Sequence, residues 1–245
     1  MDGATETGAR AARTAKRTAI QRRNEAKILE AALDVFSAAG FAGATVDQVA
    51  ERAGMSKPNL LYYFASKEEM HAALLDRLLE TWLEPLRALD PAGEPLEELR
   101  AYLRRKLAMA REYPRESRLF AHEVIQGAPR IAPVLAGPLR ALVEEKAAVI
   151  AGWIAAGRLA PVEPRHLIFA IWATTQHYAD FDAQVRAVLG GDDDARFADA
   201  AATLERMMIE GLRPRAPSAA PAPLSPDARW ATAPPAATRG IAPAP

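Results

Sequence analysis

The stretch TVDQVAERAGMSKPNLLYYFASKEEM, residues 45–70, decides the fold class that the sequence predicts. Thr45 is followed three residues later by Gln48, which is the spacing of a capping box at the start of a helix. The helix must end before Gly54, because glycine favours the left-handed conformation that stops a helix. The first half of the stretch therefore predicts one short, capped helix.

The second half of the stretch predicts another short helix and the start of a long one. Ser56 is a helix-starting residue, and Pro58 is tolerated soon after it because first-turn amides have no intrahelical partner. Ser66 with Glu69 forms a further capping box, from which a long helix runs to about residue 89. Two short helices joined by a tight turn have the form of a helix-turn-helix.

The rest of the chain also shows helical periodicity, with glycine and proline between the periodic segments and no alternating run typical of a strand. The predicted class is all-α. A first helix should span about 18–39 and stop at Gly40, and Gly137-Pro138 should interrupt a later one. The other helices are expected near 94–112, 115–126, 130–156, 165–189 and 193–211. The predicted domains are a disordered basic arm (1–17), a helix-turn-helix domain (18–66), a helical effector-binding and dimerisation domain (67–213) and a disordered Pro/Ala-rich tail (214–245).

Composition excludes several kinds of site. The chain has no cysteine, and its four histidines do not cluster at metal-ligand spacing, so neither a metal site nor a cysteine nucleophile is expected. No apolar stretch is long enough to span a bilayer, and no signal peptide is recognisable, so we expect a soluble cytoplasmic protein. The 31 basic and 31 acidic residues balance, so only their distribution is informative.

Positive charge gathers next to the predicted helix-turn-helix. Seven basic residues lie between Arg10 and Lys27, against one acid. In the second short helix, the side chains expected to face outward are Lys57, Asn59, Tyr62 and Tyr63. Lysine and tyrosine reach phosphates, and asparagine and lysine also read base edges. The alternative is a helical hairpin with a solvated charged tail, but helices this short contribute little core.

The same residues carry a family resemblance. The stretch from Ile28 to Leu75 resembles the DNA-binding domain of the TetR family of transcriptional regulators. The resemblance implies an all-helical, homodimeric repressor whose C-terminal region binds a small-molecule effector. It places DNA contacts on Thr45, Ser56, Lys57, Tyr62, Tyr63 and Lys67. The chain departs from many members by having Leu61 in place of tyrosine and Tyr63 in place of histidine, so the operator sequence does not carry over.

A candidate effector site lies in HLIFAIWATTQHYADF, residues 166–181. Trp172 and Gln176 are four residues apart and therefore share one helix face. A buried glutamine presents a donor beside an acceptor, which matches the edge of a cyclic imide such as a pyrimidine base. Trp172, or Trp82 from the fourth helix, would stack on the ring. Periodicity alone leaves open that both tryptophans are core and that Gln176 bonds a backbone carbonyl or a dimer mate.

A second resemblance covers most of the chain, from about Ile28 to Arg215, and includes LAPVEPRHLIF (159–169) and IWATTQHYADF (171–181). These segments are similar to the pyrimidine-utilisation regulators of the TetR family. That similarity implies uracil or thymine as effector, contacted from Trp82, Trp172 and Gln176, and no cofactor. The last two helices are long enough to pair with their copies in a homodimer.

Three alternatives stay open. The first is a TetR-type repressor that responds to a different planar or hydrophobic small molecule. An enzyme acting on nucleobases is disfavoured, because the sequence has no metal-ligand set, no nucleophile and base pair, and no phosphate loop. A helical interaction module with no DNA role would show no salt-dependent binding to duplexes.

Overall fold

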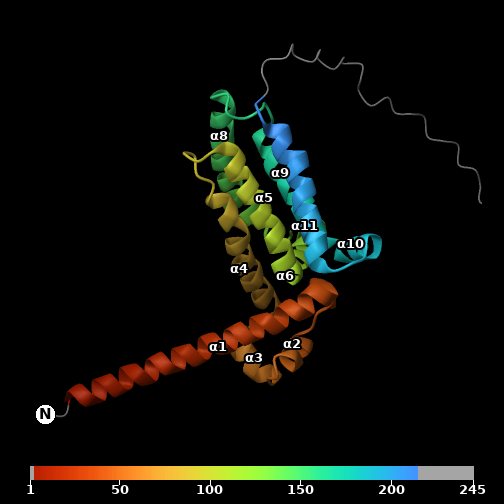
Figure 1. Ribbon diagram of the computed structural model, residues 1–245. Coiled ribbons are helices and arrows are strands. Elements are labelled where there is room, and N and C mark those ends of the chain that lie inside the picture. Colours follow the sequence, from red (N-terminus) through yellow and green to blue (C-terminus); the bar gives the residue numbers. More distant parts are fainter. Residues whose placement is uncertain (1–2, 215–245) are drawn as a thin grey trace, which may run out of the picture. The chain divides into compact units, whose positions relative to one another are not determined.

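The computed structural model describes the backbone of residues 3–214 and the side chains of residues 19–214. The regular elements in this part of the chain are all helical, which confirms the predicted all-α class (Figure 1). No helix here is long and apolar enough to cross a membrane. Apart from Pro214, the predicted tail 214–245 lies outside the described residues.

Helix α1 (Gly3–Gly43) is longer than the sequence predicted. It begins at Gly3 rather than near residue 18, so most of the expected disordered arm, 1–17, belongs to this helix. The residue types explain the difference, since alanine and arginine, which dominate this segment, are strong helix formers. The predicted stop at Gly40 is confirmed, because Gly40 has a φ of 67° and breaks the regular helix there.

Helices α2 (Val46–Arg52) and α3 (Lys57–Tyr63) form the predicted helix-turn-helix. Thr45 and Gln48 make both hydrogen bonds of the capping box. Ser56 occupies the predicted N-cap position of α3, but its side chain makes no capping hydrogen bond. Pro58 accounts for this in part, since it removes one of the two amides that such a hydroxyl accepts from.

Helix α4 (Lys67–Arg87) joins the two halves of the described chain. Ser66 caps it by accepting from the Glu69 amide, while the Glu69 carboxylate accepts from Ala65 rather than completing the box at Ser66. The first turns of α4 pack through Met70, with Leu74 and Leu75, in one core with α1 to α3. Its last turns pack through Leu83, Leu86 and the following Leu89 in a second core.

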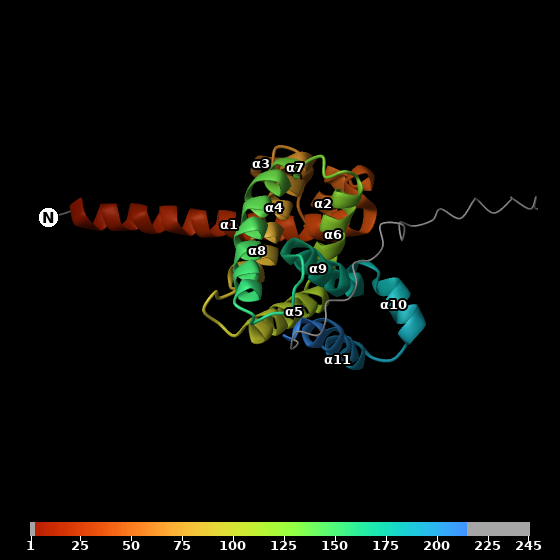
Figure 2. The same ribbon diagram turned by 90° about the horizontal axis from the view of Figure 1, so that it is seen from above.

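The helices that follow α4 in the chain are α5 (Pro95–Glu112), α6 (Pro114–Ile125), α7 (Ala132–Val134) and α8 (Arg140–Ala155), as Figures 1 and 2 show. Helices α5 and α8 supply buried residues such as Leu103 and Ile150 to the second core, whereas Leu119 of α6 belongs to the first core. The expected interruption at Gly137-Pro138 is confirmed: a π-helical turn, η1 (Leu135–Leu139), lies there. A proline inside a helix lacks the amide for the regular hydrogen bond, which favours such a turn.

The last part of the described chain is more broken than predicted. The expected helix 165–189 divides at Phe181 into α9 (Pro164–Asp180) and α10 (Asp182–Leu189), and no glycine or proline marks the break. The expected helix 193–211 becomes α11 (Asp193–Leu204), followed by a π-helical turn η2 (Glu205–Ile209) and a 3-10 turn η3 (Glu210–Leu212). Helix α9 packs against α5, α6 and α8, so it is central to the second core.

Candidate DNA-binding surface and effector pocket

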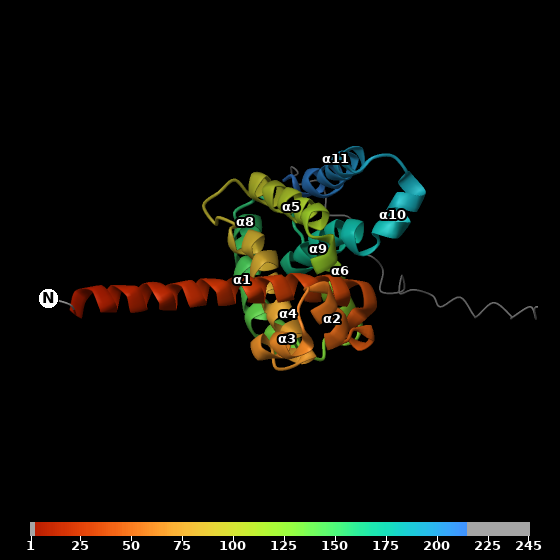
Figure 3. The same ribbon diagram turned by 90° about the horizontal axis from the view of Figure 1, so that it is seen from below.

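Helix α3 exposes nearly all of its side chains. Leu60 is its one buried residue, and it packs with Val49 and Ala50 of α2. Asn59 and Tyr62 face outward, and Tyr62 is 70% exposed. Figure 3 shows α2 and α3 side by side beneath α1. A helix held by so small a contact leaves its polar face open to a partner.

The other predicted DNA contacts fall into two groups. Thr45 and Ser56 are exposed at the starts of α2 and α3, and Lys57 is exposed with its ammonium 2.9 Å from the Asp47 carboxylate. Tyr63 is half-buried instead, and its hydroxyl accepts a hydrogen bond of 2.7 Å from Asn24 of α1. The first group is exposed to a ligand, although Lys57 pairs with Asp47 of the neighbouring helix, whereas Tyr63 already ties α3 to α1.

Lys67 is likewise engaged within the protein. Its ammonium donates to the backbone carbonyls of Phe41 and Ala44, at 2.9 and 3.0 Å, and lies 4.3 Å from the Phe41 ring centroid. These bonds hold the link between α1 and α2 against the start of α4. His71, one turn further along α4, packs edge-on against the same ring, and burial lowers its pKa to about 4.

The side of α1 that leads to the helix-turn-helix carries exposed cations. Arg22, Arg23 and Lys27 are exposed, and a side chain built at Gly54 would approach the Lys27 ammonium to 3.6 Å. Lys27 therefore lies beside the turn between α2 and α3. This positive charge next to an open helix face fits a polyanion such as the DNA backbone.

The three predicted effector residues come together in the structure. Trp82 of α4, with Trp172 and Gln176 of α9, lines a single cavity. Its remaining wall is mostly apolar and comes from four elements: Leu79, Leu83, Lys106, Phe120 and Leu139. The cavity measures about 30 Å³. Ligand sites usually measure about 300–1,000 Å³, so a ring could enter only if these side chains moved.

The two indole groups at this cavity differ in their hydrogen bonding. The Trp172 Nε1 donates to the Tyr102 hydroxyl at 2.5 Å, and burial raises the pKa of Tyr102. The Trp82 Nε1 is buried and has no hydrogen-bond partner among the described residues. Trp172 is thus fixed through its nitrogen and offers its ring, whereas Trp82 holds an unused donor.

Lys106, from the middle of α5, is a cavity residue that the sequence did not predict. It is 2% exposed and lines the cavity, with its ammonium 5.0 Å from the Trp82 ring centroid. Burial lowers its pKa to about 7, and the charge of Asp180 opposes that shift. One signal for it exists in the sequence: Lys106 falls on the same helical face as Leu99 and Leu103, which are buried.

Family comparisons identify the kind of protein. Residues 28–74 match the model of the bacterial regulatory proteins of the tetR family. Residues 75–215 match the model of the C-terminal region of YcdC-like proteins. The chain belongs to the TetR family of transcriptional regulators.

A TetR-family relative covers most of the chain. The HTH-type transcriptional regulator RutR of Escherichia coli K12 is 49% identical over 204 residues, which are 82% of this chain and 96% of RutR. The chain is therefore a DNA-binding transcriptional regulator and not an enzyme.

Solved structures of other regulators share the fold. AibR, crystallised with isovaleryl coenzyme A and operator DNA, matches with a TM-score of 0.61 at 19% identity, over 76% of this chain and 98% of AibR. A TetR-like regulator from Rhodococcus sp. RHA1 matches with a TM-score of 0.57 at 25% identity, over 77% and 96%.

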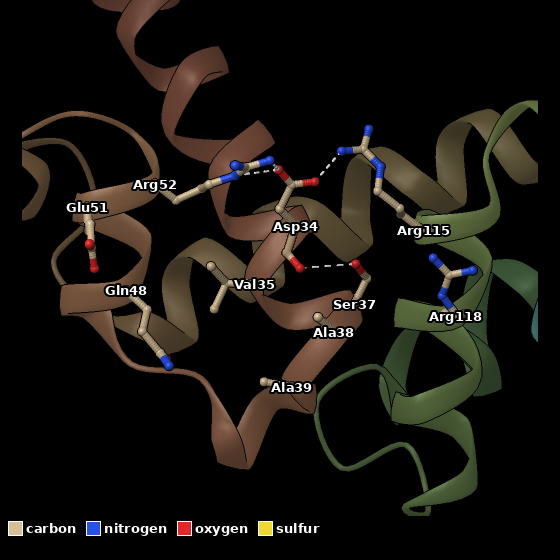
Figure 4. Close-up of a pocket in the computed structure, with 10 residues that line it drawn as sticks. All are labelled: Asp34, Val35, Ser37, Ala38, Ala39, Gln48, Glu51, Arg52, Arg115 and Arg118. Carbon is tan, nitrogen blue, oxygen red and sulfur yellow. Dashed lines mark hydrogen bonds and ion pairs between the residues drawn. The ribbon is translucent and has the colours of Figure 1, made fainter.

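A second, larger pocket lies where α6 meets the DNA-binding helices α1 and α2 (Figure 4). It measures about 860 Å³. Asp34 of α1 is at its centre and pairs with Arg52 of α2 and Arg115 of α6, and Arg115 also pairs with Glu30. Burial alone would raise the pKa of Asp34, but hydrogen bonds from the two arginines outweigh it and lower that pKa. One carboxylate therefore joins three helices.

Proposed function

We propose that this regulator is a repressor of pyrimidine utilisation, acting in the cytoplasm, that binds its operator as a homodimer and leaves it when uracil or thymine binds. The observation that carries the proposal is the convergence of Trp82, Trp172 and Gln176 on one cavity. These are the positions that resemblance to the pyrimidine-utilisation regulators assigns to the effector.

The chemistry of the cavity suits a flat ring with an imide edge. Two indole groups supply faces for stacking, and one of them is already oriented by its bond to Tyr102. The Gln176 amide offers a donor and an acceptor side by side, which complements the acceptor and donor of a cyclic imide. An apolar wall excludes water and strengthens those hydrogen bonds.

Because the cavity is so small, the effector must change the protein's conformation in order to bind. A pyrimidine ring needs more room than about 30 Å³, so binding must displace helices or side chains around the cavity. An effector shifts a conformational equilibrium only by its differential affinity for the two states. A cavity that opens for the ligand provides that difference.

Helix α6 offers a path from the cavity to the DNA-binding helices. Phe120 of α6 lines the cavity, and Ser117 on the same helix donates to Asp180 of α9. Arg115, also on α6, holds Asp34 of α1, and Asp34 holds Arg52 of α2. A shift of α6 would therefore change the placement of the helix-turn-helix.

On the DNA side, we propose that α3 enters the major groove, as the second helix of this motif does. Asn59 would read a base edge, while Lys57 and Tyr62 would meet phosphates. Thr45 and Ser56 would present the amide ends of their helices to the backbone. Tyr63 and Lys67 were also assigned DNA contacts, and we now propose that they act mainly by fixing α3 and the start of α4.

We further propose that α9 and α11 form the dimer interface. The outer face of α9 exposes His166, Phe169, Ala173 and His177 at helical spacing, and α11 exposes the small residues Ala198 and Ala202. Such faces pack closely against a copy of themselves across a two-fold axis. The two copies of α3 would then lie roughly 34–36 Å apart, one turn of B-DNA.

A mobility-shift assay on DNA upstream of the gene tests this function. Wild-type protein should bind, uracil should release it, and Gln176→Ala should bind but resist release. Gln126→Ala, an exposed glutamine at the end of α6, is the matched control and should respond like wild type. Operator binding that uracil does not change would contradict the proposed effector.

A second effector class fits the same cavity. Its wall is largely apolar and its volume is small, so another planar or hydrophobic molecule would also need it to open. Calorimetric competition among uracil, thymine and unrelated heterocycles decides between the two. Tighter binding of an apolar ring without an imide edge would favour this second class.

A further inference from the structure

Lys106 has an unusual position for a lysine on α5. Arg104 and Arg105 on the same helix are exposed and pair with Glu205 and Glu112. Lys106 instead points inward and forms part of the cavity wall, although its side chain carries the same kind of charge. Burying an ammonium group is costly unless something compensates for the lost water.

The compensation within the protein is weak. The Trp82 ring offers a cation–π contact at 5.0 Å, and Asp180 contributes an attractive field. Lys146 of α8 shows what a satisfied buried lysine looks like here. Its ammonium donates to the Leu89 carbonyl at 3.3 Å and lies 3.1 Å from a Glu145 oxygen. Lys106 has no ion pair or hydrogen bond of this kind to the described residues.

A second unused donor belongs to another residue of the same cavity wall. The buried Trp82 Nε1 has no acceptor among the described residues, and Trp82 and Lys106 both belong to the cavity wall. The Trp172 Nε1, by contrast, already has Tyr102 as its acceptor. Lys106 and Trp82 of the cavity wall thus each carry a donor that has no hydrogen-bond acceptor among the described residues, which suits a ligand that supplies oxygen acceptors.

We propose that Lys106 contacts the effector directly, donating a charge-assisted hydrogen bond to a ring carbonyl oxygen, and that it thereby selects carbonyl-bearing rings over rings with an amino group in that place. The inference rests on the proposed function, because it deepens the same effector site. Gln176 would hold the imide edge, and Lys106 would hold an oxygen from the α5 side. An amino group would set a donor against a donor and leave the ammonium unsatisfied.

Calorimetry on the full-length protein tests the role of Lys106, with uracil and cytosine as probes. Cytosine carries an amino group where uracil has one of its carbonyl oxygens. Lys106→Met keeps the length of the side chain and removes its charge, so uracil should bind about tenfold or more weakly. The preference for uracil over cytosine should fall together with that affinity. Lys146→Met, the matched control outside the cavity, should bind uracil like wild type.

A further variant and a melting curve keep the result interpretable. Lys106→Gln retains a neutral donor and should bind uracil with intermediate affinity, and a cooperative thermal transition shows that each variant is folded. Equal uracil affinity and unchanged selectivity in folded Lys106→Met would overturn the role of Lys106 alone. Wild-type protein that takes up no uracil would overturn the proposed effector, and this inference with it.

Discussion

The DNA-binding end and the effector end of this regulator are built differently. The candidate DNA contacts lie within residues 45–67, on two short helices and their starts. The effector cavity draws its wall from α4, α5, α6, η1 and α9, which are far apart in the sequence. The first site is therefore specified by local signals such as caps and turns, whereas the second exists only after the helices have packed.

The largest expected effect is at the one fully buried side chain of α3. Leu60→Ala truncates that side chain, and such a change typically costs about 2–5 kcal/mol. Urea unfolding should show this loss, and operator binding should fall with it. Leu61→Ala, at a position 36% exposed, is the control and should change the free energy of unfolding by about 0.5 kcal/mol or less. An equally small loss for Leu60→Ala would show that α3 is held by other contacts.

The next largest change in stability is expected at the effector end. Lys106→Met should stabilise the unliganded protein by about 1–4 kcal/mol, since a buried charge gives way to an apolar side chain. The folded pKa of Lys106 is about 7, below its ordinary 10.5, so the unfolded chain binds more protons between these values. The contribution of Lys106 to the free energy of unfolding of the wild type therefore rises between pH 7 and pH 10.5.

The stabilisation by Lys106→Met therefore depends on pH in a predictable direction. The gain in free energy of unfolding over wild type should be largest below pH 7 and should shrink as the pH rises towards 10. Chemical denaturation at pH 6 and pH 9 measures it. Lys146→Met, which breaks existing bonds, should destabilise the protein at both values. A gain in free energy of unfolding from Lys106→Met that grows with pH would contradict the burial of a charged lysine.

A smaller effect is expected at the junction between the two ends. Asp34→Asn weakens the ion pairs to Arg52 and Arg115, both of which are partly exposed, so it should cost about 1 kcal/mol. This contribution is present above pH 4 and is lost as the pH falls through the lowered pKa of Asp34. The effect of uracil on operator affinity should also fall. Asp76→Asn, an exposed acid on α4, serves as the control.

The smallest changes are expected at Lys57 and Lys67. The sequence predicted a DNA contact for both lysines, but the two variants should differ in what they change. Lys57→Ala should reduce the slope of log affinity for DNA against log salt by about 1, with little change in stability. Lys67→Met should instead destabilise the protein, because Phe41 and Ala44 lose the ammonium that their carbonyls accept from. Titrations at several salt concentrations measure both variants. Equal changes in slope would restore Lys67 as a phosphate contact.

The sequence predictions were more accurate for the DNA-binding end than for the effector end. The capping pair Thr45 and Gln48, and Gly40 with its positive φ, determine the backbone only of the few residues next to them. The helix-turn-helix boundaries were therefore predictable. The break at Phe181 was not, because no local residue demands it. Spacing placed Trp172 and Gln176 on one helix face, and family resemblance assigned both of them, with Trp82, to the effector. Periodicity does not predict that Trp82 of α4 meets the other two at one cavity.

Lys106 shows most clearly why the effector end was incompletely predicted. It stands in the run Arg104-Arg105-Lys106, which looks like a solvated charged face. Only its alignment with Leu99 and Leu103 places it on the buried face. Whether a residue on that face is core or cavity wall depends on what α4 and α9 bring opposite it, and that is a tertiary property.

The central claim is that filling the cavity and binding the operator oppose each other through α6. Calorimetric titration of uracil into free protein and into operator-bound protein tests it directly. Linkage requires the operator to weaken uracil binding by the same factor by which uracil weakens operator binding, about 5–150-fold for a coupling of 1–3 kcal/mol. Uracil affinity that is lower on the operator by that shared factor is the predicted result. Equal uracil affinity for free and operator-bound protein would contradict the account.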